Sequence, residues 1–182
     1  IYSLPPVLVR KSYIVTAYSS IVAGNKFFYC SASIAERKVA YYSVDDIVSA
    51  SAEELNTTET EIDVNQNLVY NFVADNSGNV YTIGYESSAY YLAKIAPDLS
   101  VEKINLSFTP VDQTKYNYQA NSLAVSADGT AIYVSASDNS VYRYVIGNAG
   151  SLATPFIAAD ADGHALNGAG VVTDPQNCDL YV

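Results

Sequence analysis

Short runs of apolar and aromatic residues alternate with turn-forming residues along the chain, and their order recurs about every fifty residues. The marker of each repeat is a tyrosine that follows an apolar residue a few positions after a turn. These tyrosines are Tyr29, Tyr81, Tyr133 and Tyr181, at spacings of 52, 52 and 48 residues. Each preceding turn contains Gly or Asn, which accept the positive φ of tight hairpins. The pattern predicts antiparallel strands joined by hairpins, with tyrosine at a repeated packing position.

Each repeat also has the same internal order. An apolar strand precedes the turn, the tyrosine strand follows it, a second tyrosine-rich strand comes next in the first three repeats, and a more ragged strand closes the unit. Four short antiparallel strands in about fifty residues are typical of a β-propeller blade, with a β-sandwich as the alternative. We therefore predict one all-β propeller domain over 1–182, with about 3.5 four-stranded blades. The predicted blades are 13–65, 68–110, 121–159 and an incomplete 167–182.

One repeat carries a family resemblance. The stretch "NSLAVSADGTAIYVSASDNSVYRYVIGNAGSL" (121–152) resembles a blade of the YVTN or lactonase-like propellers, and "VVTDPQNCDLYV" (171–182) resembles the first half of one. In that family an apolar strand leads into Ser-x-Asp-Gly, then Leu-Tyr-Val, Asn-Ser-Val and a further strand. The resemblance implies the propeller fold. It also implies that a lactonase-like or cyclase-like enzyme, with a polar site at the channel mouth, is an alternative function.

The fourth predicted blade reaches only its second strand at Val182, and an unpaired strand edge is a feature that proteins avoid. Three explanations remain open. The sequence is part of a longer propeller, residues 1–12 return as a closing strand, or another subunit supplies strands by β-augmentation. In the last case the unpaired edge near Val182 binds a protein partner or a second copy.

The amino-acid composition of the chain disfavours some classes of binding partner and indicates where the protein acts. The chain has 17 tyrosines and a net charge of −10, the opposite of the balance that a phosphate-binding nucleic-acid protein needs. No apolar run is long enough for a membrane span. The N-x-S/T tripeptides at Asn56 and Asn105, together with low lysine content and two cysteines, favour an extracellular, secreted glycoprotein.

Cys30 lies on the second strand of the first repeat, and Cys178 lies at the turn into the second strand of the fourth. In a closed ring of four blades these strands belong to neighbouring blades, and a disulfide between them is possible. In a longer propeller the two residues lie far apart, and each is free or paired elsewhere. Two cysteines and a single histidine without close spacing do not make a zinc site.

Most of the candidate catalytic and ligand-binding residues lie in one predicted loop. His164, the only histidine, precedes the innermost strand of the fourth blade, where a propeller loop lies near the mouth of the central channel. Together with Asn167 and Asn121 it is the candidate ligand-binding set, and it is the one candidate catalytic residue. Asp160 and Asp162 are calcium candidates, although the later ligands of an Asp-rich calcium loop are missing. No cofactor-binding motif occurs, and no cofactor is expected.

No cluster of His, Arg and Glu accompanies the lactonase-like resemblance, so the sequence favours a protein without catalytic activity. We expect a secreted propeller module that serves as a structural scaffold or as a protein- or ligand-binding surface, either alone or within a larger assembly. The enzyme alternative stays open. A carbohydrate-binding lectin is a third alternative, because exposed tyrosine rings can stack on sugars.

Overall fold

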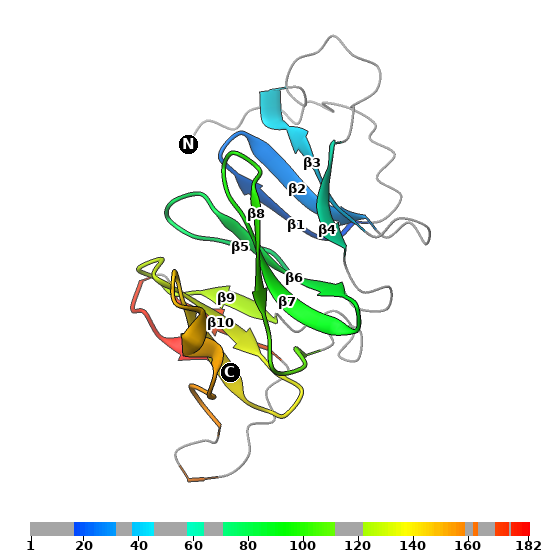
Figure 1. Cartoon of the computed structure of the whole chain (residues 1–182). Helices are drawn as coiled ribbons and strands as arrows, with labels where there is room; N and C mark the ends of the chain where they lie inside the picture. Colours follow the sequence, from blue (N-terminus) through cyan, green and yellow to red (C-terminus); the bar gives the residue numbers. More distant parts are fainter. Residues whose placement is uncertain are drawn as a thin grey trace.

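The structure is a computed structural model that describes residues 17–31, 38–45, 58–63, 71–111, 122–158, 162–163, 170–174 and 176–182. The described part of the chain is built from four antiparallel sheets that follow one another in sequence. Figure 1 shows them stacked from the sheet of β1–β4, through that of β5–β8, to the C-terminal strands. No helix in the described ranges has the length and apolar character that crossing a membrane requires.

The first two sheets are complete four-stranded meanders in which every strand pairs with the next one along the chain. The first comprises β1 (Ala17–Ala23), β2 (Lys26–Ser31), β3 (Lys38–Ser43) and β4 (Thr58–Asp63). The second comprises β5 (Val73–Ala74), β6 (Val80–Glu86), β7 (Ala89–Ile95) and β8 (Val101–Asn105). We call these sheets blades 1 and 2, because sequential meanders packed face to face form the blades of a propeller.

The remaining sheets have fewer strands. Blade 3 contains β9 (Leu123–Val125), β10 (Ala131–Ser135) and β11 (Val141–Val145), followed by the 3-10 helix η2 (Ala149–Leu152). A single bridge between Val141 and Ile157 takes the place of its fourth strand. Blade 4 contains β12 (Val172–Thr173) and β13 (Leu180–Tyr181). The predicted all-β class and the predicted strand order are therefore confirmed.

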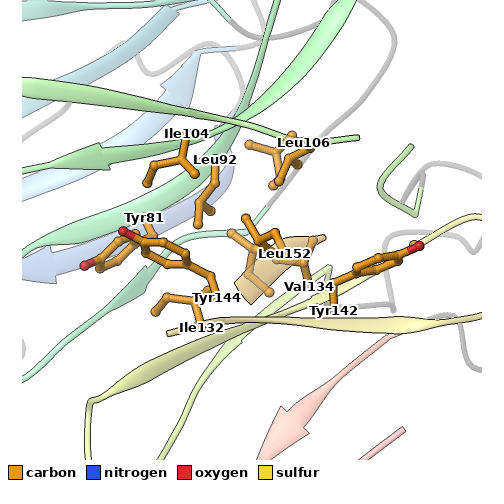
Figure 2. Packing of buried hydrophobic residues seen from close by; sticks show 12 residues of the cluster. Tyr81, Leu92, Ile104, Leu106, Ile132, Val134, Tyr142, Tyr144 and Leu152 are labelled. Carbon is orange, nitrogen blue, oxygen red and sulfur yellow. The ribbon is translucent and has the colours of Figure 1, made fainter. Parts of the chain in front are cut away.

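The core lies between the blades. The largest cluster of buried apolar side chains lies between blades 2 and 3. It contains side chains from the face of blade 2 that points to blade 3 and from the opposing face of blade 3. In Figure 2, Tyr81, Leu92 and Ile104 of blade 2 lie opposite Ile132, Tyr144 and Leu152 of blade 3. Smaller clusters fill the interfaces between blades 1 and 2 and between blades 3 and 4. Because each fully buried large side chain contributes about 1.5–3 kcal/mol, the stacked interfaces supply most of the stability.

The repeated tyrosine does not occupy the same face in every blade. Tyr81 faces blade 3, and Tyr133 packs toward blade 4. In blade 1 the residue that faces blade 2 is Phe28, whereas the neighbouring Tyr29 points the other way and stacks on Tyr42, with ring centroids 5.2 Å apart. The expectation that all four tyrosines share one packing position is therefore wrong for Tyr29.

The different lengths of the hairpin turns explain why Tyr29 and Tyr81 face different sides of their blades. Ala23 pairs with Lys26 across the short Gly24–Asn25 turn, whereas Ala74 pairs with Val80 across Asp75–Asn79. When two turns differ in length, residues at the same distance after the turn need not have equivalent partners on the neighbouring strand. A shift of one residue in this pairing moves a side chain to the other face of the sheet.

A glycine in blade 2 makes room for a buried ring. Gly84 and Tyr91 are directly opposite each other on β6 and β7, and the Tyr91 ring lies over Gly84. The ring is buried against blade 1, and the Lys103 ammonium lies 5.1 Å from its centroid. A side chain at Gly84 would therefore overlap a ring that blade 1 holds in place.

We expect Gly84→Ala to lower the free energy of unfolding by about 1–3 kcal/mol, the usual cost of overpacking. Urea denaturation followed by far-UV circular dichroism measures it. In the background of Tyr91→Leu, which removes the ring, the same Gly84→Ala change should cost much less. An equal cost in both backgrounds would contradict this interpretation of the pair.

Candidate functional site

Most of the predicted ligand-binding residues are not placed by the structure. His164, Asn167, Asn121 and Asp160 lie outside the described residues. Asp162 is described and lies exposed in a turn with Gly163. Within the described ranges, no three side chains of His, Cys, Asp or Glu gather closely enough to hold a metal ion. The proposed catalytic role of His164 and the calcium role of Asp160 and Asp162 stay predictions.

The structure describes the side chain of one of the two cysteines. Cys178 is an exposed free thiol at the turn into β13, and the side chain of Cys30 lies outside the described ones. Whether Cys30 and Cys178 pair stays a prediction. The sequon at Asn56 is outside the described residues, whereas Asn105 lies at the exposed end of β8. Its glycosylation stays a prediction.

The inner strands of neighbouring blades are joined by side-chain hydrogen bonds to the backbone. The Asn71 amide binds both backbone groups of Leu123: its Oδ1 accepts from the amide N–H at 2.9 Å, and its Nδ2 donates to the carbonyl at 2.8 Å. The Ser122 hydroxyl also donates to Asn71 Oδ1, at 3.2 Å. Asn71 thus imitates a strand partner and bridges blade 2 to blade 3.

Two more bonds connect blades in the same manner. Asn76 Nδ2 donates to the Asp128 carbonyl at 3.0 Å, from one inner turn to the next. Thr173 Oγ1 donates to the Val125 carbonyl at 2.5 Å, from blade 4 to blade 3. These polar side chains near the propeller axis have partners in the adjacent blade, so their role is to hold the blades in register. Sequence reasoning missed Asn71, because its partner lies about fifty residues further along the chain.

A buried carboxylate organises the inner turn of blade 2. Asp75 accepts hydrogen bonds from the backbone N–H groups of Ser77 and Asn79, both at 2.9 Å, from Asn79 Nδ2 at 2.7 Å, and from the Tyr81 hydroxyl at 3.0 Å. Burial raises the pKa of Asp75, but these hydrogen bonds outweigh it and hold the pKa below its usual value. Burial and the neighbouring Asp75 raise the pKa of the Tyr81 hydroxyl well above its usual value. The Asp75 carboxylate is therefore a structural anchor that stays ionised at neutral pH.

A different part of the molecule is exposed and apolar. Large apolar side chains at the C-terminal end are about half exposed: Phe156 at 47%, Val172 at 52%, Tyr181 at 53% and Val182 at 45%. We call the exposed surface to which these four residues contribute the C-terminal face: Phe156 lies on the side of blade 3 that points to blade 4, whereas Val172 and Tyr181 lie on the far side of blade 4. Val172 and Tyr181 are directly paired on β12 and β13, so both point away from blade 3. Their neighbours Val171 and Leu180 point inward and pack against blade 3.

The same end of the molecule has an open strand edge. In blades 1 to 3 the second strand is paired on both sides, as β6 is with β5 and β7. In the described part of blade 4, β13 pairs only with β12. A strand edge of this kind pairs with a further strand, of the same chain or of another.

A cation borders the C-terminal face. The Arg143 guanidinium lies 4.6 Å from the centroid of the Phe156 ring, and the Tyr133 ring lies 5.7 Å from the same centroid. Tyr133 and Arg143 are half-buried, whereas Phe156 is exposed. The three side chains form a layer on the side of blade 3 that points to blade 4.

The comparisons with known proteins agree with this architecture. A family model described as "Domain of unknown function (DUF5074)" matches residues 39–182. The chain belongs to the DUF5074 family. The description assigns no activity to DUF5074, and no functionally curated protein matches the sequence.

Solved structures place the DUF5074 chain among the propellers. A quinonprotein alcohol dehydrogenase-like protein from Bacteroides thetaiotaomicron is 29% identical, with a TM-score of 0.74, over 91% of this chain and 39% of that one. A protein of unknown function from the same organism has 12% identity and a TM-score of 0.54, over 91% of this chain and 38% of that one. The DUF5074 chain thus spans less than half of either structure. The similarity confirms the predicted propeller fold.

A luciferin-regenerating enzyme is more distant, at 18% identity and a TM-score of 0.49 over 90% of this chain and 53% of that one. A similarity at this level supports no inference about the activity of DUF5074. The YVTN family expected from the sequence is not among these proteins, whereas its propeller fold is shared by them.

Acid should act on this DUF5074 domain through Asp75. Because hydrogen bonding lowers the folded-state pKa, the contribution of the carboxylate is present above the unfolded pKa of about 3.9 and is lost as pH falls through the folded value. Asp75→Asn should lower the free energy of unfolding at pH 7 by about 1–3 kcal/mol and weaken its dependence on pH in acid. Urea denaturation between pH 7 and pH 3 measures both effects.

The matched control is Asp179→Asn, which alters an exposed carboxylate in the corresponding turn of blade 4. Its unfolding curves should follow those of the unmodified chain at every pH. If Asp75→Asn left both stability and its acid dependence unchanged, the anchoring role of Asp75 would be wrong.

Proposed function

We propose that this DUF5074 chain is a non-catalytic propeller module that serves as a scaffold and binds a protein partner at its C-terminal face. The observation that carries the proposal is the exposure of Tyr181. Tyr81 occupies the corresponding position in blade 2 and is fully buried by the next blade, whereas Tyr181 is 53% exposed. An aromatic side chain at a position that forms inter-blade core elsewhere in the molecule is suited to contact with another protein surface.

The open edge of β13 supports the same proposal. A partner that adds a strand there would satisfy the backbone groups of the edge and place a side chain beside Tyr181. We therefore favour a role within a larger assembly.

The module is proposed to act outside the cell. The support is the sequon at Asn105, which lies at an exposed position on β8 between the buried residues Ile104 and Leu106. A sugar attached at Asn105 would project into solvent without disturbing the interface between blades 2 and 3.

The proposal predicts opposite outcomes for two neighbours on β13. Tyr181→Ser should leave the free energy of unfolding within about 0.5 kcal/mol, as for most surface changes, and should lower binding of an apolar dye such as ANS and any self-association. Leu180→Ser, on the opposite face, should destabilise the chain by about 1–3 kcal/mol, because Leu180 packs against blade 3.

Urea denaturation, ANS fluorescence and sedimentation velocity over a concentration series provide the readouts. The binding role of the C-terminal face fails if Tyr181→Ser destabilises the chain as much as Leu180→Ser does. It fails equally if dye binding and association are the same with and without the Tyr181 ring.

A further inference from the structure

Turns from three successive blades are in contact on one side of the molecule. The turn between the first two strands is Gly24–Asn25 in blade 1, Asp75–Asn79 in blade 2 and Ser126–Thr130 in blade 3. The turns of blades 2 and 3 lie side by side (Figure 1). The β7–β8 turn of blade 2, residues 96–100, contacts both blade 1 and the first turn of its own blade. Three links therefore connect these turns in a row.

The first link joins blade 1 to the β7–β8 turn. Lys26, the first residue of β2, donates from Nζ to the Pro97 carbonyl at 3.0 Å. Leu99 in the same turn has a φ of +74°, in the left-handed region that side chains of this size disfavour. Its side chain packs against the apolar cluster between blades 1 and 2. Because this packing offsets the backbone strain, the conformation of the turn depends on blade 1.

The second link lies within blade 2. The Pro97 ring lies against the turn of Asp75–Asn79, since a Cβ atom at Gly78 would stand 3.7 Å from Pro97 Cγ. Gly78 has a φ of +79°, and its N–H donates to the Asp75 carbonyl at 3.1 Å. The Asp75 carboxylate also holds this turn through the N–H groups of Ser77 and Asn79. A turn held so tightly passes a displacement on instead of absorbing it.

The third link joins blade 2 to blade 3. Asn76 Nδ2 donates to the Asp128 carbonyl, and the next residue, Gly129, lies against the Asn76 side chain. A Cβ atom at Gly129 would stand 2.6 to 3.1 Å from three atoms of that side chain, so the approach requires glycine. The Asp128 carboxylate accepts from Ser126 Oγ at 2.6 Å and from the Thr130 N–H at 3.0 Å. The position of Asn76 thus bears on the whole turn of blade 3.

We propose that these three links make the turns one conformational unit, so that a change at Lys26 in blade 1 alters the opening of the turn at Gly129 in blade 3. A molecule that orders one of the turns would then order its neighbours too. The physical basis is a contiguous set of packed and hydrogen-bonded groups, together with one strained residue that blade 1 holds in place. The inference concerns a part of the molecule other than the C-terminal face and is independent of the proposed function.

Amide hydrogen exchange, measured by NMR on the full chain under native conditions, tests the coupling. The N–H groups of Leu99, Gly78 and Gly129 each donate to a carbonyl of their own turn at 2.8 to 3.1 Å, so their exchange reports the opening of that turn. Lys26→Met removes the first link and leaves a side chain of similar length. We expect exchange to become about 3-fold to 10-fold faster at Leu99 and about 2-fold to 5-fold faster at Gly78 and Gly129.

The matched control is Lys103→Met. It makes the same substitution in blade 2 and removes a bond of similar length, the 2.9 Å ion pair of Lys103 Nζ with Glu86 Oε2. Glu86 lies at the end of β6 that is remote from the Asp75–Asn79 turn. Exchange at Gly78 and Gly129 should therefore be the same in Lys103→Met as in the unmodified chain.

A second variant tests the route. Asn76→Ala removes the link between blades 2 and 3, and it should accelerate exchange at Gly129 by itself. When Lys26→Met is added to Asn76→Ala, we expect faster exchange at Leu99 and Gly78 but no further change at Gly129, because the connection is already broken. Further acceleration at Gly129 in the double variant would show that the route through Asn76 is wrong.

The Ala136 N–H, which donates to the Ser140 carbonyl at 2.9 Å at the other end of β10, separates coupling from global stability. Its exchange should not respond to Lys26→Met. Equal acceleration at Ala136 and Gly129 would mean that the substitution lowers the stability of the whole chain, and the inference would be wrong. It would be wrong as well if Lys26→Met acted on Leu99 and left Gly78 and Gly129 unchanged, because the turns would then open independently.

Discussion

Each blade of this protein has two apolar faces, and both must be covered for the blade to be stable. Blade 2 meets the requirement fully: Val80 is fully buried on the side of blade 1, and the adjacent Tyr81 is fully buried on the side of blade 3. A single twisted sheet of this size could not bury both residues, since adjacent side chains on a strand point in opposite directions. The architecture is therefore a stack, in which every interface depends on the presence of the next blade.

Apolar packing alone does not fix how the stack is rotated, because hydrophobic contact has little directionality. The hydrogen bonds near the axis supply the direction. Asn71 binds both the N–H and the carbonyl of Leu123, and Thr173 binds the carbonyl of Val125. These side chains satisfy backbone groups at the inner edges, where neighbouring strands of different blades do not pair as a sheet. The positions of Asn71 and Thr173 are thus explained by structure.

The repeat in the sequence was sufficient to predict the strand order, because turns and apolar strands are local signals. It was not sufficient for register. Tyr29 matches the spacing of Tyr81 and Tyr133, yet Phe28 takes the position that faces the next blade, since the Gly24–Asn25 turn is shorter than the corresponding turn of blade 2. The spacing of one residue type cannot report a shift of one residue when turn lengths differ. The C-terminal face was predictable only in part. The unpaired edge near Val182 follows from counting strands, but Arg143 is notable only because the exposed Phe156 ring lies against it.

The small size of blade 4 also couples the binding of a partner to the stability of this blade. Blade 4 is held by the inward side chains of two short strands and by the Thr173 hydrogen bond. A partner strand on β13 would add backbone hydrogen bonds, so binding should stabilise blade 4. The interaction that would extend blade 4 is then the strand pairing that already joins the strands within blades 1, 2 and 3.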